Sequence, residues 1–178
     1  MSDNIKLKAY EFAMNKHKGQ KDDDGKDYFY AHVCQVAHLI CAVTYGFPNA
    51  DEIVSACYLH DTIEDTETTY EELKKEFGQK IADLVNEVTH NGQKDEYGYY
   101  FPRLKSKEAI MIKFSDRLSN LSRMSSWDEK RQDQYLRKSK FWNSNKAKDI
   151  GFDFLNDPKE DIYNEGDGKP IWSILSAK

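Results

Sequence analysis

The sequence predicts an all-α protein made of a single domain. Only 4 Pro and 9 Gly occur among its 178 residues, which is too few for a fold of many short strands and turns. Apolar residues recur at spacings of three and four through most of the chain, as they do on the buried face of a helix. The length suffices for one continuous core but not for two catalytic domains, so we expect one helical bundle with one active site.

Three helices are expected in the first third of the chain. The first covers residues 4–17, where apolar residues follow a possible capping residue. The charged run at 21–27 breaks this pattern and indicates a solvated loop. A second helix is predicted over residues 30–45, and a third over residues 51–61. Because apolar residues surround the third helix almost completely, we expect it to be central and buried.

Two shorter helices and a loop are expected next. Thr69 and Glu72 have the spacing of a capping box, which predicts a short helix ending near residue 78. Residues 80–89 carry apolar side chains on one face and indicate another helix. Residues 91–102 contain two glycines, three tyrosines and a proline with no clear period, so they are predicted to form a loop.

The last part of the chain is expected to add two helices and a tail. A long helix is predicted over residues 106–125, and another begins near residue 127. We expect residues 1–155 to form the catalytic domain. Residues 156–178 are mostly polar and predict a C-terminal tail, whose Pro-Ile-Trp patch is suited to docking on the body.

Charge and composition restrict the class of partner. The formal net charge is −5, so there is no general positive field to hold a nucleic acid polymer, although a bound cation could still attract a small anion. No stretch approaches the ~18 apolar residues of a membrane span, and the first residues lack the pattern of a signal peptide. We therefore expect a cytoplasmic protein with neither a nucleic acid nor a membrane partner.

The three cysteines favour a reducing compartment. Cys34, Cys41 and Cys57 all lie in apolar helical patterns, and none forms a CxxC pair or a zinc-like cluster. We expect them to be free thiols in the core, as unpaired cysteines usually are. This expectation is consistent with a cytoplasmic location.

The densest group of possible metal ligands follows the third helix. His60 and Asp61 end an apolar run that should carry them into the interior, where an unpartnered carboxylate is costly. Glu64 and Asp65 lie one helical turn further on, so all four could converge on one patch. Such a cluster is also compatible with a solvated helix end, but its burial favours a bound metal.

Two residues from other helices could complete the site. His32 stands near the start of the second helix, on the face that continues into the core. Asp116 lies in a long apolar run, with Asn120 one turn further along the same face. A buried salt bridge with Arg117 or Lys113 would explain Asp116 equally well.

Two imidazoles and two carboxylates suit Mn²⁺, Fe²⁺ or Zn²⁺ better than Ca²⁺. Such a site would lower the pKa of a bound water and polarise a phosphoryl oxygen, while a nearby carboxylate moves a proton. The pattern therefore predicts a metal-dependent phosphohydrolase.

The chain resembles the HD superfamily, and more narrowly the hydrolase domain of the RelA/SpoT-homologue family and its small alarmone hydrolases. The resemblance covers roughly residues 5–142 and combines an HDxxEDT string at residue 60 with a KxxDRLxNL string at residue 113. It implies a helical bundle around one Mn²⁺. The implied ligands are His32, His60, Asp61 and Asp116.

The resemblance also implies a substrate and the residues that act on it. Glu64 and Asp65 would activate the water, and Asn120 would contact the nucleotide. Lys21 stands where the family usually has a basic pair that holds phosphates, but here three aspartates follow it. The implied reaction removes the 3′-pyrophosphate of guanosine tetra- or pentaphosphate, giving GDP or GTP and pyrophosphate.

Other functions stay open on sequence grounds. An HD hydrolase could act on a different phosphorylated nucleotide, for example on the 2′-phosphate of NADPH. The fold could also bind a nucleotide or a protein partner without turnover, for example as an antitoxin, although an acid pair beside a metal has no purpose there. His90 is either a substrate contact or a solvated loop residue, and His17 and His38 are expected to be structural or on the surface.

Overall fold

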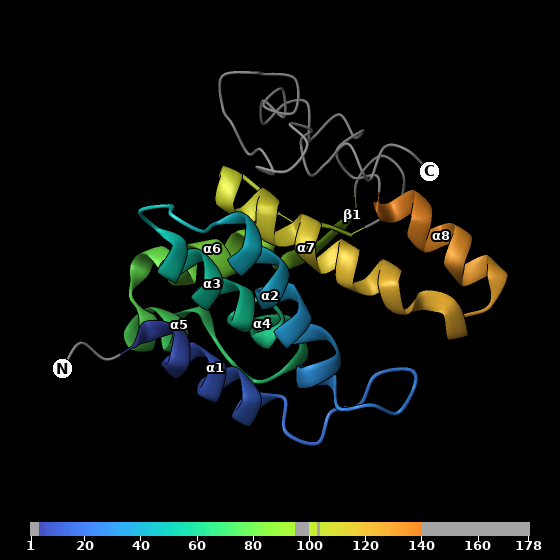
Figure 1. Ribbon diagram of the computed structural model, residues 1–178, viewed down its shortest axis with the longest axis horizontal. Coiled ribbons are helices and arrows are strands. Elements are labelled where there is room, and N and C mark those ends of the chain that lie inside the picture. The colour runs from blue at the N-terminus through green and yellow to red at the C-terminus, as the bar shows by residue number, and fades with distance from the viewer. Residues whose placement is uncertain (1–3, 95–99, 103, 140–178) are drawn as a thin grey trace. The chain divides into compact units, whose positions relative to one another are not determined.

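The computed structural model describes residues 4–94, 100–102 and 104–139 of the chain (Figure 1). In chain order the elements of this part are α1 (Ile5–Lys16), the π-helical turn η1 (Phe29–Val33), α2 (Cys34–Val43), α3 (Ala50–Leu59), α4 (Thr62–Asp65), α5 (Tyr70–Phe77), α6 (Gln79–Val88), β1 (His90–Lys94), β2 (Tyr100–Pro102), α7 (Lys107–Arg123), the 3₁₀ turn η2 (Met124–Ser126) and α8 (Glu129–Ser139). The predicted all-α fold is confirmed, with one small hairpin added.

Helix α3 lies at the centre of the described bundle, as its apolar surface predicts. It packs against α1 and α2, and also against α6 and α7 (Figure 1). Its side chains at Ile53, Ala56, Cys57 and Leu59 have no exposed surface. Because α3 is held from several directions, its C-terminal end is a fixed platform for the polar residues that follow it.

Several helix ends form for the reasons that the sequence suggests. The Asn4 side chain accepts hydrogen bonds from the backbone N–H groups of Lys6 and Leu7 at the start of α1. Thr69 accepts from the backbone of Glu72 and begins α5. Gly78 then adopts a φ of 85°, a conformation that costs glycine little, and separates α5 from α6.

The third helix ends earlier than predicted. It stops at Leu59, and after a short turn the chain forms α4, in place of one continuous helix to residue 61. The Thr62 hydroxyl donates to the Leu59 carbonyl at 2.7 Å, and the His60 ring donates to the Cys57 carbonyl at 2.8 Å. These side chains compete with the backbone for carbonyl groups, which explains the break in the helix.

Residues 91–102 were predicted to be a loop, and this prediction is wrong where the segment is described. β1 pairs antiparallel with β2, with His90 opposite Pro102 and Lys94 opposite Tyr100. The register shifts between these pairs, so the strands show no regular alternation that the sequence could reveal.

The cysteine expectation is correct for two of the three thiols. Cys34 and Cys57 are buried, whereas Cys41 lies exposed on α2, because the buried face of that helix consists of Cys34, Val36, Ala37 and Ile40. In the described ranges no helix is both long enough and apolar enough to cross a membrane. The predicted domain boundary at residue 155 and the tail at 156–178 lie outside the described residues.

Candidate metal centre and active site

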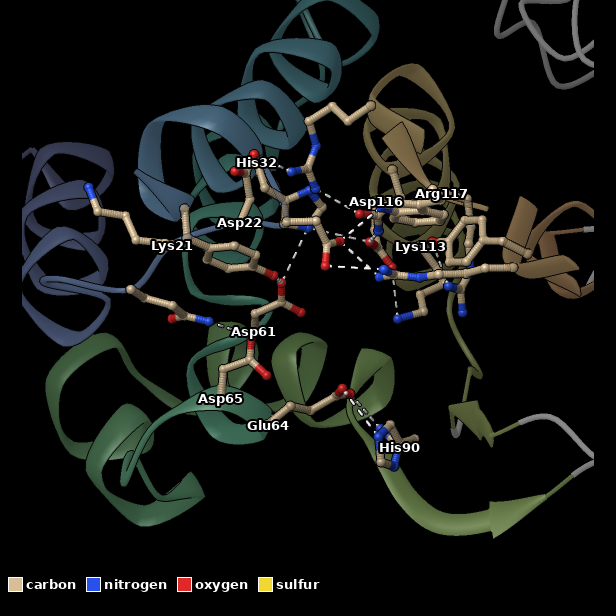
Figure 2. Close-up of a pocket in the computed structure, with 18 residues that line it drawn as sticks. Lys21, Asp22, His32, Asp61, Glu64, Asp65, His90, Lys113, Asp116 and Arg117 are labelled. Carbon is tan, nitrogen blue, oxygen red and sulfur yellow. Dashed lines mark hydrogen bonds and ion pairs between the residues drawn. The ribbon is translucent and has the colours of Figure 1, made fainter. Parts of the chain in front are cut away.

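The four predicted metal ligands come from η1, from the turn between α3 and α4, and from α7, and they meet in the interior. Figure 2 labels His32, Asp61 and Asp116 of this group. The Nε2 atoms of His32 and His60 lie 3.3 Å apart. Asp61 Oδ2 is 3.0 Å from His60 Nε2 and 3.2 Å from His32 Nε2. Asp116 Oδ1 is 3.5 Å from His32 Nε2. All four residues are buried, and ligand atoms of His32, His60 and Asp116 lie within 4.8 Å of one another.

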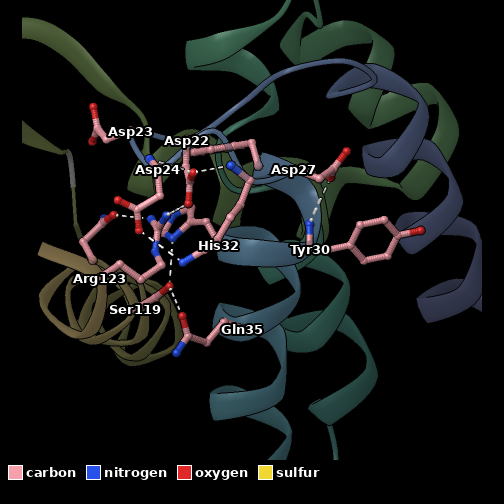
Figure 3. Close-up of polar contacts among 12 residues, drawn as sticks. Asp22, Asp23, Asp24, Asp27, Tyr30, His32, Gln35, Ser119 and Arg123 are labelled. Carbon is pink, nitrogen blue, oxygen red and sulfur yellow. Dashed lines mark hydrogen bonds and ion pairs between the residues drawn. The ribbon is translucent and has the colours of Figure 1, made fainter. Parts of the chain in front are cut away.

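Hydrogen bonds on the far side of each ring decide which nitrogen faces the centre. His60 Nδ1 lies 2.8 Å from the Cys57 carbonyl, which can only accept, so Nδ1 carries the proton. His32 Nδ1 lies 2.9 Å from Ser119 Oγ, and that hydroxyl donates to Gln35 Oε1 at 2.8 Å (Figure 3). Because the hydroxyl proton is used there, Ser119 accepts from His32. Each Nε2 therefore directs a lone pair into the centre.

This arrangement fits a divalent cation. Two ring lone pairs facing each other beside two carboxylates repel unless a proton or a cation lies among them. Although burial lowers the pKa of His60, the carboxylates of Asp61 and Asp116 outweigh it and raise this pKa to about 9. Burial likewise raises the pKa of Asp61, but His60 and His32 hold it well below its usual range. The centre thus favours positive charge, and its two nitrogens and two carboxylates suit Zn²⁺, Mn²⁺ or Fe²⁺.

Asp116 takes part in both arrangements that the sequence left open. Its Oδ2 forms a 2.9 Å salt bridge with Lys113, while its Oδ1 faces His32 and accepts from Asn120 at 2.7 Å. Burial raises the pKa of Asp116, but Lys113 and Arg117 together bring it well below its usual range. The carboxylate is therefore ionised and available as a ligand.

The side chains of Lys113 and Arg117 are themselves buried beside the candidate metal centre. Lys113 is 8% exposed and Arg117 is 7% exposed, and Arg117 also donates to the Tyr135 hydroxyl at 2.8 Å. Buried positive side chains are rare without a negatively charged partner. Their position gives one wall of the site a positive charge, which favours an anionic substrate.

The two predicted catalytic acids lie on α4 at the edge of the same cavity, whose volume is about 560 Å³. Glu64 accepts from the backbone N–H of His90 at 2.8 Å, and its second oxygen is 3.4 Å from the His90 ring (Figure 2). Asp65 accepts from Gln20 at 3.3 Å, and burial together with Asp61 raises its pKa. Both acids line the cavity, but neither belongs to the cluster of predicted metal ligands.

The predicted substrate residues also line this cavity. Asn120 connects the metal centre to the cavity rim, because it donates to Asp116 and accepts from Arg123 at 2.8 Å. Lys21 borders the cavity, but in Figure 2 its ammonium extends away from the ligand cluster. His90 lies at the cavity as well, whereas His17 is buried against Gln20 and His38 is exposed.

Sequence reasoning missed two residues that hold the ligands. Tyr28 donates to Asp61 Oδ2 at 2.6 Å, and Ser119 accepts from His32. Burial and the Asp61 charge raise the pKa of the Tyr28 hydroxyl, so it stays a donor. The spacing of Ser119 from Asp116 gave a weak signal, because position i+3 lies near the same helix face. Nothing in the aromatic run around Tyr28 distinguished it from a core residue.

Substituting Ser119 with alanine is expected to weaken metal binding by about 10- to 100-fold, the usual effect of losing a partner that orients a ligand histidine. The measurement is competition for Zn²⁺ against a chromophoric chelator. Ser115→Ala is the matched control, because Ser115 is equally buried on the same helix. Ser119→Thr should restore most of the affinity. Equal affinities for the two alanine variants would contradict this assignment.

Comparison with known proteins agrees with the site. Residues 9–98 match the HD domain family, a range that holds His32, the segment from His60 to Asp65, and half of the chain. A solved structure, described as a metazoan ortholog of SpoT that hydrolyses ppGpp, superimposes with a TM-score of 0.65 at 26% identity. That match covers 84% of this chain and 86% of the other.

Curated relatives point the same way. A guanosine-3′,5′-bis(diphosphate) 3′-pyrophosphohydrolase of Aquifex aeolicus is 39% identical over 122 residues, which is 64% of this chain but only 17% of that protein. The MESH1 proteins of Xenopus tropicalis and Homo sapiens, which bear the same enzyme name, are each 32% identical over 73% of this chain and 78% of their own length. The chain therefore belongs to the HD domain family of metal-dependent hydrolases, among the relatives of the MESH1 proteins.

Proposed function

We propose that this protein removes the 3′-pyrophosphate from guanosine tetra- or pentaphosphate, with Mn²⁺ as its metal. The observation that carries the proposal is that one cavity is lined both by three of the predicted metal ligands, His32, Asp61 and Asp116, and by the basic residues Lys113, Arg117, Arg123 and Arg131. A polyphosphorylated substrate matches this combination, because guanidinium groups bind phosphate oxygens in pairs. The names of the similar proteins support guanosine-3′,5′-bis(diphosphate) as the substrate.

The proposed reaction assigns a role to each group of residues. His32, His60, Asp61 and Asp116 would hold the cation, which lowers the pKa of a bound water and polarises a phosphoryl oxygen. Glu64 and Asp65 orient the attacking water and accept its proton. The oxygen of that water bonds to the phosphorus next to the 3′-oxygen, and the bond from phosphorus to the 3′-oxygen breaks. The proton passes to the 3′-oxygen, so the products are GDP or GTP and pyrophosphate.

Hydrogen bonds within the chain orient the Glu64 and Asp65 carboxylates. Glu64 is held by the His90 backbone and Asp65 by Gln20, so both carboxylates keep fixed positions before the substrate arrives. Lys113 and Arg117 would stabilise the charge that grows on the phosphoryl oxygens. Asn120 and Lys21 are proposed to contact the nucleotide from the rim.

A substrate panel tests the proposal. Purified protein with Mn²⁺ is incubated with guanosine tetraphosphate, NADPH or ordinary nucleoside triphosphates, and Asp61→Asn serves as the inactive control. We expect pyrophosphate release from guanosine tetraphosphate alone. Phosphate release from NADPH would instead identify a nucleotide 2′-phosphatase. Stoichiometric metal without turnover of any compound would indicate a binding module.

Replacing Mn²⁺ by Fe²⁺ or Zn²⁺ in the same assay tests the metal. The mixed nitrogen and oxygen donor set is compatible with all three ions. The highest turnover with Mn²⁺ is the expected result, and equal or higher turnover with either other ion would contradict that part of the proposal.

A further inference from the structure

Two of the aspartates that follow Lys21 contact arginines that line the cavity, Arg123 and Arg131. We name residues 22–24 the aspartate loop. Asp22 Oδ2 accepts from Arg123 at 3.2 Å, at the end of α7 (Figure 3). Asp23 accepts from both terminal nitrogens of Arg131, at 3.1 and 2.8 Å, and from the Trp127 ring nitrogen at 2.8 Å. The loop thus forms ion pairs with two arginines that line the cavity.

The loop is shaped to present these carboxylates. Asp22 Oδ1 accepts from the backbone N–H groups of Asp24 and Lys26, at 3.0 and 2.8 Å, which leaves Oδ2 directed at Arg123. The Asp22 side chain is only 5% exposed. Arg131 lowers the pKa of Asp23, so that carboxylate is charged as well. The acidic run is therefore an ordered partner of the arginines and more than a solvated loop.

The two arginines have donor capacity that the aspartates leave unused. Arg123 Nε is buried and has no hydrogen-bond partner among the described residues. Its terminal nitrogens contact Asp22 and Asn120, and Asn120 contacts Asp116 at the metal centre. Arg131 lies 4.0 Å from the centre of the Trp127 ring, a contact that would hold it in place without Asp23. A phosphate group offers more acceptor oxygens than one carboxylate and could use these donors.

We propose that Arg123 and Arg131 form a phosphate-binding subsite, and that Asp22 and Asp23 occupy it until a phosphate of the substrate displaces them. The proposal rests on the proposed function only in taking the substrate to be a polyphosphorylated nucleotide. The phosphates bound here are those distant from the scissile bond, because the subsite lies at the rim and the metal ligands lie deeper.

Competition of this kind lowers the affinity of the site for small anions. Asp23 and Arg131 are each about half exposed, and exposed ion pairs are weak enough for a doubly charged phosphate to displace. A displaced aspartate also stays close to the phosphate and repels it. The loop thereby sets a threshold that favours ligands with several phosphates over those with one.

The test measures binding of inorganic pyrophosphate to the intact protein by calorimetry, which requires no nucleotide and no turnover. Asp23→Asn should bind pyrophosphate roughly two- to fivefold more tightly, which matches the strength of an exposed ion pair. Arg123→Gln and Arg131→Gln should bind it more weakly. Asp24→Asn is the matched control, because it removes the same charge from the same loop, where Asp24 pairs with Lys26 at 3.1 Å.

A double variant separates this competition from a general charge effect. In Arg131→Gln protein, the additional Asp23→Asn change should no longer improve binding. The proposal is overturned if Asp23→Asn gives no gain, if the gain persists without Arg131, or if Asp24→Asn gives the same gain. Undetectable pyrophosphate binding by every variant would also overturn it. A protein that fails to hydrolyse guanosine tetraphosphate yet shows the expected pattern would contradict the proposed function and leave the subsite intact.

Discussion

Replacing His60 with alanine is expected to abolish stoichiometric metal binding and, with it, hydrolysis. The substitution removes one of two ring nitrogens that lie 3.3 Å apart and both face the Asp61 carboxylate. Loss of a direct ligand should weaken metal binding by more than the roughly 100-fold that follows loss of an orienting partner. Metal analysis after gel filtration measures the first effect, and the guanosine tetraphosphate assay measures the second.

The control for His60→Ala is His38→Ala, which removes an exposed imidazole from α2. This variant should keep its metal and its activity. A His60→Ala protein that retains one ion per chain and full turnover would show that the His32, His60, Asp61 and Asp116 cluster is not the catalytic centre. Thermal unfolding of both variants confirms that they are folded, since the lost ring also removes a hydrogen bond to Cys57.

Glu64→Gln is expected to lower kcat by about 10²- to 10⁴-fold, the usual contribution of general acid–base catalysis. The amide keeps the size of the side chain and can still accept from the His90 backbone through its oxygen. It can no longer take a proton from water. The metal content should not change, because Glu64 lies outside the ligand cluster. Steady-state kinetics, with metal analysis in parallel, measure the result.

The matched comparison is Glu67→Gln, which makes the same change at an exposed position just after α4. We expect its kcat to equal that of the unaltered protein. An unchanged kcat in Glu64→Gln would exclude Glu64 as the base and direct attention to Asp65. A lower kcat accompanied by metal loss would mean that Glu64 supports the metal centre instead.

The burial of His60, Asp61 and Asp116 could be predicted from the sequence, because each of them adjoins an apolar run. His60 and Asp61 end an apolar run, and Asp116 interrupts another, so their burial could be read from the surrounding residues. The pairing of His90 with Pro102 could not be predicted, because short irregular strands have no period. The end of α3 at Leu59 depends on side chains that bond to backbone carbonyls, a choice that hydrophobic periodicity does not express.

The positive wall of the cavity was also only partly predictable. Lys113 and Arg117 were considered as partners of Asp116, and the 2.9 Å contact of Lys113 agrees with that interpretation. That Lys113 and Arg117 also line the cavity could not be predicted, because it depends on how α7 is rotated against α2 and α3. Pairing of Asp23 with Arg131 joins residues 108 positions apart, and no local pattern indicates such a contact.

The π-helical turn η1 restricts how this region can change in length. It holds Phe29 and Val33 in the core and His32 at the candidate metal centre. Deleting one residue from a helical segment turns everything beyond it by about 100°, so His32 and the core residues could not all keep their directions. Insertions or deletions of a single residue within residues 28–34 should therefore yield defective proteins, and changes in length are better placed ahead of Tyr28.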